Sequence, residues 1–266
     1  MSSADIEITE SSRVASRTPT AAWVWIALGV YVLSTLSASA ILLAVQPYAR
    51  VDTAVLSLVQ FGPVVGALVT WLMFRRTVAG VLPTAVSVGQ VVVNVGAVVA
   101  VCVMYWLLTT AMAIVSGTAT VGPAAVGGVP FVVFLMLQLA GASGEEIGWR
   151  GLMQPMLESR MAKLAAVSIT GLSWALWHIQ AFTAGPVTAG CFFAATMAFA
   201  VVLGYLGTGS VRQRVLVAAI GHWLINAASY LLAGDSTLDR PQIVFVAGAA
   251  VMVAAGAMLA RRLPRF

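Results

Sequence analysis

Eight long apolar runs constrain the fold of this chain more than any other feature of its sequence. Each run is close to the roughly 20 residues that an α-helix needs to cross a bilayer. The runs cover residues 21–45, 54–74, 88–115, 126–146, 163–183, 187–209, 215–233 and 242–260. Because lipid offers no hydrogen-bond partner to an open backbone, apolar runs of this length fold as helices. The predicted fold is therefore an all-α, polytopic membrane bundle of about eight transmembrane helices.

The composition excludes an ordinary soluble domain. Hydrophobic residues make up 61% of the chain, charged residues make up 9%, and the mean hydropathy is +0.98. Soluble domains carry about 25% charged residues. Residues 1–18 are polar and lack apolar periodicity, so we expect a disordered cytoplasmic tail before a single transmembrane domain over 19–266. The two cysteines lie within apolar runs and indicate neither a disulfide framework nor a cysteine metal site.

The basic residues predict the orientation of the bundle. With eight spans both termini lie on one side, and that side carries all but two of the 14 Lys and Arg residues. The exceptions are Arg50 and Arg240. Because cytoplasmic segments are enriched in Lys and Arg, we expect both termini in the cytoplasm. The net charge of +5 follows from this topology. No clustered basic face with aromatic residues suggests a nucleic-acid partner.

Polar motifs interrupt three of the apolar runs. An ionisable residue inside a membrane span is a functional candidate, because burying it is costly. The first motif is Glu145-Glu146-x-x-x-Arg150. If the helix continues through it, Glu146 and Arg150 share a face and can pair, while Glu145 points elsewhere and can serve as a general base. Ordinary charge pairing at a solvated helix end is the alternative.

Both histidines of the chain lie in the other two motifs. Trp174 and His178 are one helical turn apart, so the indole can pack against the imidazole. His222 and Asn226 also share a helix face, where an imidazole and an amide can bind an oxyanion or hold a water. The alternatives are a His178 satisfied by a neighbouring helix, and simple helix–helix hydrogen bonding by His222 and Asn226.

Together the three motifs permit two kinds of hydrolytic site. In one, His178, His222 and Glu145 form a His₂Glu zinc site with an open water position. In the other, the glutamate and one histidine activate water, and the second His/Asn pair stabilises a tetrahedral oxyanion. Both predict hydrolysis of an acyl bond, most simply a peptide bond. Because Asn226 is a poor zinc ligand, the metal-free arrangement is slightly favoured and zinc stays an open alternative.

At these motifs the chain resembles the CAAX protease and bacteriocin-processing (Abi) family of intramembrane proteases. The resemblance covers about residues 126–234. It implies that Glu145 activates water with His178 as its partner, and that His222 and Asn226 form the oxyanion site. The family pattern usually has Phe where this chain has Trp174.

The resemblance also assigns supporting roles to Glu146, Arg150 and the aromatic Trp174. It implies an intramembrane endopeptidase whose partners are membrane lipid and a peptide or protein substrate, one that can carry a lipidated or hydrophobic tail. The chain is short and rich in Ala, Val and Gly, which favours a bacterial plasma-membrane protein. We expect the site to open toward the cytoplasmic half of the membrane.

Two other classes of function fit a polar cluster inside such a bundle. One is a non-catalytic membrane scaffold or immunity protein, and the other is a proton-coupled transporter. Transporters often show repeat symmetry between their halves. Here the charged motif residues all fall in the second half, which disfavours a repeat-built transporter. The sequence predicts no particular oligomeric state.

Overall fold

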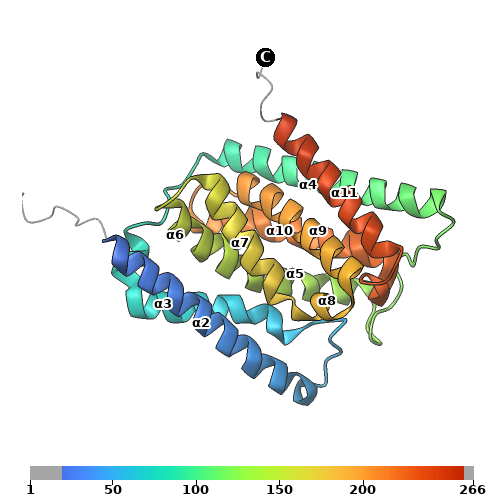
Figure 1. The fold of residues 1–266 in the computed structure, drawn as a ribbon, viewed down its shortest axis with the longest axis horizontal. Helices are drawn as coiled ribbons and strands as arrows, with labels where there is room; N and C mark the ends of the chain where they lie inside the picture. The colour runs from blue at the N-terminus through green and yellow to red at the C-terminus, as the bar shows by residue number, and fades with distance from the viewer. Residues whose placement is uncertain (1–19, 261–266) are drawn as a thin grey trace, which may run out of the picture.

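The computed structural model describes residues 20–260 and is built from helices (Figure 1). The helices are α2 (Ala21–Val45), α3 (Gly62–Ala79), α4 (Val88–Val115), α5 (Phe131–Gly148), α6 (Gln154–Glu158), α7 (Lys163–Trp177), α8 (Ile179–Thr183), α9 (Pro186–Leu206), α10 (Val211–Ala233) and α11 (Gln242–Ala260). Three short 3₁₀ segments, η2 (Gln46–Ala49), η3 (Leu58–Phe61) and η5 (Gly234–Ser236), and a π-helical turn, η4 (Trp149–Met153), complete the described elements. The all-α prediction is confirmed, whereas the expected tail at 1–18 lies outside the described residues.

Seven helical stretches in the described part of the chain are long and apolar enough to cross a membrane. They are Ala21–Ala49, Leu58–Ala79, Val88–Val115, Phe131–Glu158, Pro186–Leu206, Val211–Ser236 and Gln242–Ala260. A polytopic membrane bundle is therefore confirmed. These stretches correspond to seven of the eight predicted spans.

The remaining predicted span, 163–183, is not one unbroken helix. α7 has 15 residues, about 22 Å of helix, which is short of the roughly 30 Å hydrocarbon core. It ends at Trp177, because His178 has φ −85° and ψ 63°, outside the helical region. The chain then continues as the short α8 and leads into α9. The expectation of a continuous fifth helix is wrong, although α7 and α8 together follow the predicted path.

The long helices alternate in direction, so the bundle has two ends. We call one the basic end; it holds the connections 80–87, 159–162 and 207–210 and lies toward the left of Figure 1. We call the other the loop end; it holds the longer connections 46–61, 116–130, 178–185 and 234–241 and lies toward the right. This alternation places the start of α2 and the end of α11 on the side of the basic end.

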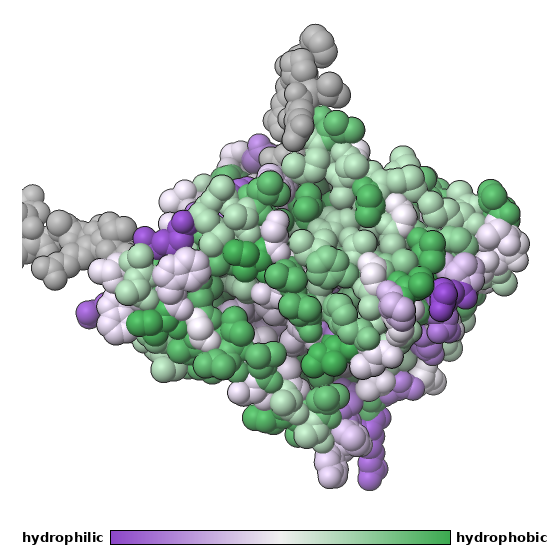
Figure 2. All heavy atoms as spheres, in the orientation of Figure 1, coloured by the Kyte–Doolittle hydropathy of each residue, from purple (hydrophilic) through white to green (hydrophobic). Residues whose placement is uncertain are grey.

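The outer surface of the bundle suits a lipid environment. Large apolar side chains of α2, α3 and α4 are exposed, among them Leu33, Leu72 and Val92. In Figure 2 hydrophobic residues cover the middle of the visible face, and hydrophilic residues gather toward its edges. The polar motif residues lie in the interior. There α5 packs against α10, and α7 packs against α9, which in turn packs against α10, so the three motif-bearing helices surround one interior.

Candidate active site

The Glu145-Glu146 pair lies near the end of α5, in the interior of the bundle. The helix continues through the motif as expected, passing from α5 into η4 and then α6. The side chains are fully enclosed, with 1% exposure at Glu145 and 0% at Glu146. π-Helical turns within α-helices are frequent at functional sites. A solvated helix end, the alternative for this motif, is therefore excluded by the burial of both carboxylates.

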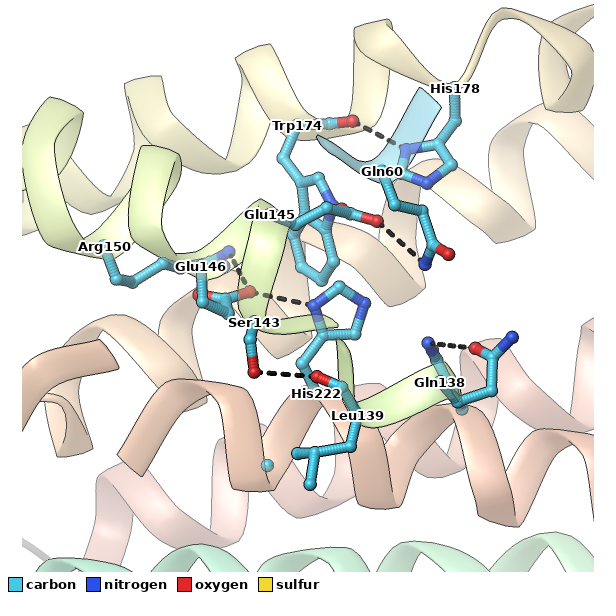
Figure 3. Close-up of polar contacts among 12 residues, drawn as sticks. Gln60, Gln138, Leu139, Ser143, Glu145, Glu146, Arg150, Trp174, His178 and His222 are labelled. Atoms are coloured by element: carbon cyan, nitrogen blue, oxygen red, sulfur yellow. Dashed lines mark hydrogen bonds and ion pairs between the residues drawn. The ribbon is translucent and has the colours of Figure 1, made fainter. Parts of the chain in front are cut away.

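Glu146 joins two of the three motifs. Its Oε1 accepts a hydrogen bond from Arg150 Nη1 at 2.9 Å, which is the predicted pairing. The same oxygen accepts a hydrogen bond from His222 Nδ1 at 2.9 Å, as Figure 3 shows. This second contact was not predicted. It fixes the His222 ring on α10 against the carboxylate of α5.

Two neutral N–H donors hold the Glu145 carboxylate, one at each oxygen (Figure 3). Trp174 Nε1 donates to Oε2 at 2.8 Å. Gln60 Nε2 donates to Oε1 at 3.3 Å. The sequence had suggested only that Trp174 packs against His178. In the structure it also donates a hydrogen bond to Glu145. Its ring also lies 5.0 Å from the His222 ring, and Arg150 Cζ lies 4.5 Å from its centroid.

Gln60 is a site residue that the sequence analysis missed. It belongs to η3, just before α3, and an amide inside a predicted span is the signal that could have identified it. It reaches Glu145 because α5 carries glycine where η3 crosses it: a Cβ at Gly141 would overlap the Gln60 amide, and one at Gly144 would crowd Phe61. Small residues allow such close approach of helices in membranes.

His178 lies at the break between α7 and α8. Its Nδ1 is 2.9 Å from the carbonyl oxygen of Trp174. Because a carbonyl only accepts, Nδ1 carries the hydrogen, and Nε2 of the neutral ring keeps a free lone pair. The ring contacts Trp177 and Phe192 at centroid distances of 5.0 and 5.1 Å. The helix break thus turns the imidazole toward the interior with one nitrogen available.

Asn226 extends the polar cluster one turn after His222. Its Nδ2 donates to Gln138 Oε1 at 3.2 Å, and Gln138 Nε2 in turn donates to the Val55 carbonyl at 3.0 Å. Asn226 therefore hydrogen-bonds to a neighbouring helix, which was the non-catalytic alternative for this residue. One of its two amide hydrogens stays free for another acceptor.

Two adjoining cavities bring the four predicted residues together. The larger has a volume of about 530 Å³ and is bordered by His178, His222 and Asn226. The smaller, of about 230 Å³, is bordered by Glu145 and His178. His178 belongs to both. The residues thus converge on one hollow interior rather than facing lipid on separate sides of the bundle.

The larger cavity opens at the loop end. Its exposed lining residues are Thr53, Gln180 and Asp235, all in or beside connections of that end. None of the three connections at the basic end borders it. The two expectations of cytoplasmic termini and a cytoplasmic opening cannot both hold, because the chain termini and the opening belong to opposite ends of the bundle.

The described residues do not form a cluster of metal ligands. In the range 20–260, no three His, Cys, Asp or Glu side chains are grouped so that they could hold a metal ion. The Glu145 carboxylate accepts from two N–H groups, whereas Nδ1 of each histidine bonds an oxygen and Nε2 is the nitrogen left to face a ligand. The His₂Glu zinc site stays a prediction, and no catalytic step is derived through a metal.

Comparison with known proteins agrees with these motifs. Residues 127–228 match a family model described as "Type II CAAX prenyl endopeptidase Rce1-like". A curated protein of Methanococcus maripaludis, "CAAX prenyl protease 2", is 28% identical over 136 residues, which are 46% of this chain and 50% of that protein. The chain thus spans about half the length of the curated relative that it matches. Through the segment that carries its three motifs, the chain is similar to these CAAX prenyl proteases.

Proposed function

We propose that this protein is an intramembrane endopeptidase that hydrolyses a peptide bond with a water activated by Glu145 and His178. The observation that carries the proposal is the meeting of these two side chains, from different helices, at one cavity of about 230 Å³. A general base needs to reach its proton directly or through one water, and a cavity of this size holds water. The protein is proposed to act in the plasma membrane of a bacterium.

The water-activating step follows from the donors around Glu145. Trp174 and Gln60 hold the carboxylate, and His178 Nε2 offers a second acceptor to the same water. As the water oxygen bonds to the carbonyl carbon, Glu145 takes one of its protons. The C–N bond then breaks, and that proton passes to the leaving nitrogen. The reaction steps consume only the peptide substrate and one water molecule.

The oxyanion step falls to His222 and Asn226. Because His222 Nδ1 donates to Glu146, only Nε2 can donate to the developing oxyanion, and it does so in the doubly protonated ring. The Glu146 carboxylate stabilises that charged ring. Asn226 supplies its remaining amide hydrogen. Donors aimed at a developing charge in a water-poor site give large rate effects.

The larger cavity suits a substrate with an apolar segment. Phe192, Phe199 and Ile225 form part of its wall, next to the polar groups of His222 and Asn226. A peptide substrate could therefore bury an apolar side chain or a lipid tail while its peptide bond meets the catalytic groups. The Methanococcus maripaludis relative is named as a prenyl protease, and a peptide with a lipid tail or another hydrophobic segment is the substrate class proposed here.

The decisive experiment compares cleavage products in membranes that contain wild-type protein or Glu145→Gln. Loss of specific products in Glu145→Gln, with the variant present at wild-type level, is expected. Asp239→Asn is the matched control, because it makes the same carboxylate-to-amide change at an exposed residue that borders neither cavity. Unchanged products in Glu145→Gln would contradict hydrolysis and favour a scaffold or immunity role.

A further inference from the structure

We infer that the site receives its substrate from the non-cytoplasmic side of the membrane, as a peptide segment that lies at the outer face. The side on which the site opens is inferred only from the lining of the larger cavity and from the charged residues at the two ends of the bundle. The identity of the occupant as a substrate rests on the function proposed above.

The cavity extends from the loop end to about the middle of the bundle. On α5 it is bordered by Phe134 and Gln138, which lie in the first half of that helix. On α11 it is bordered by Ile243 and Val246, within the first two turns. All of these positions lie toward the loop end. The cavity is thus a passage from that end to the catalytic groups.

The two cavities do not extend into the half of the bundle nearest the basic end. His222 is the midpoint of the 23-residue α10, so it lies about 16 Å of helix rise from either end. Between the site and the basic end lie η4 and α6, whose side chains pack into the core. Leu152, Met153 and Met156 are buried, with 5%, 4% and 0% exposure. Neither cavity is bordered by a residue of η4 or α6.

The charges at the two ends assign the membrane sides. Arg150 is enclosed in the core and does not report on topology. The other described charges at the basic end are Arg75, Arg76, Arg160, Lys163, Arg212 and Arg214, with Glu158. Those at the loop end are Arg50 and Arg240, with Asp52, Asp235 and Asp239. Since Lys and Arg are enriched in cytoplasmic loops, the basic end is cytoplasmic and the cavity opens outward.

This placement narrows the substrate class. A prenylated protein tethered to the cytoplasmic leaflet could not reach an opening on the other side. The substrate is instead an exported peptide, or the outer juxtamembrane segment of a membrane protein. Its apolar part would lie along Phe192 and Phe199, and its polar part would meet Asp235 and Thr53 at the mouth.

Accessibility of a single cysteine tests the direction of opening without any substrate. Thr196 borders the cavity with 4% exposure, and Thr196→Cys changes its size little. Cys191 is replaced by Ser, and Cys102 stays as an internal control because it is buried and does not border the cavity. A small, charged, membrane-impermeant thiol reagent is then added to right-side-out and to inside-out vesicles.

We expect the cysteine at position 196 to react in right-side-out vesicles and to be protected in inside-out vesicles. Ser236→Cys at the loop end and Thr84→Cys at the basic end, both exposed, verify the orientation of each preparation. Reaction of position 196 only in inside-out vesicles would overturn the proposal. Protection in both preparations would also overturn it, because it would show that the cavity is closed to water.

A pair of membrane-anchored reporters separates this proposal from the proposed function. Each carries the same apolar cleavable segment, placed outside the membrane in one and inside in the other. We expect cleavage of the outer reporter alone, and none with Glu145→Gln. Cleavage of the inner reporter alone contradicts outer access. Cleavage of neither, with the expected labelling, contradicts the protease function but supports the outward opening.

Discussion

Trp174 shows how one residue in a motif can change what the motif does. Its indole N–H donates to Glu145, its carbonyl accepts from His178, and its ring contacts His222 and Arg150. A phenylalanine, which the family pattern usually has, could make the ring contacts but not the hydrogen bond. We therefore regard Trp174 as a positioning residue that holds the general base.

Trp174→Phe tests that role. A hydrogen bond to a charged group contributes about 1.5–3 kcal/mol, so we expect kcat to fall by about 10–100-fold while KM and thermal stability change little. Trp177→Phe is the matched control, because its Nε1 donates to Ser39 Oγ rather than to Glu145. Equal losses in both variants would argue that the indole N–H has only a packing role.

Arg150 has a different role, because it lies behind the site and pairs with Glu146. Removing one partner of a buried ion pair costs about 3–5 kcal/mol, so Arg150→Ala is expected to lower the thermal stability of the protein in detergent. Arg212→Ala removes the same charge at an exposed position and should leave stability nearly unchanged. A fully stable Arg150→Ala variant with lost activity would instead place Arg150 in the catalytic machinery.

At the scale of elements, the site depends on a helix break and on a close contact between two helical segments. The break after Trp177 turns His178 inward, and the glycines of α5 let η3 bring Gln60 to Glu145. The break was hidden from the sequence because no proline or glycine lies at residues 172–184 to signal a helix end. The close packing was hidden because it depends on a partner 85 residues away.

Gly141→Ala probes the contact between η3 and α5. The added methyl overlaps the Gln60 amide, and overpacking costs about 1–3 kcal/mol. We expect reduced activity, and a smaller effect when Gly141→Ala is introduced into a Gln60→Ala background. Gly96→Ala on α4, which has open space around it, serves as the control. Additive effects in the double variant would show that Gly141 and Gln60 act independently.

At the scale of the whole molecule, the three polar motifs meet at one interior site, and no metal-ligand cluster forms in the described range. We expect purified protein to keep its activity after exhaustive chelation, because both oxygens of Glu145 accept hydrogen bonds from N–H donors. Elemental analysis by mass spectrometry gives the second readout. Stoichiometric zinc, with activity lost on chelation and restored by zinc, would reinstate the ligand set of His178, His222 and Glu145.

The sequence by itself determined the membrane class, the approximate positions of seven of the eight predicted spans, and the candidate residues of its three motifs. Long apolar runs can only be helices in lipid, and ionisable residues inside them are too costly to be incidental. Only the tertiary structure decided the partners: Gln60 and Trp174 on Glu145, and His222 on Glu146. It also decided the direction in which the cavity opens. These features depend on contacts between distant segments, which helical periodicity within one segment does not encode.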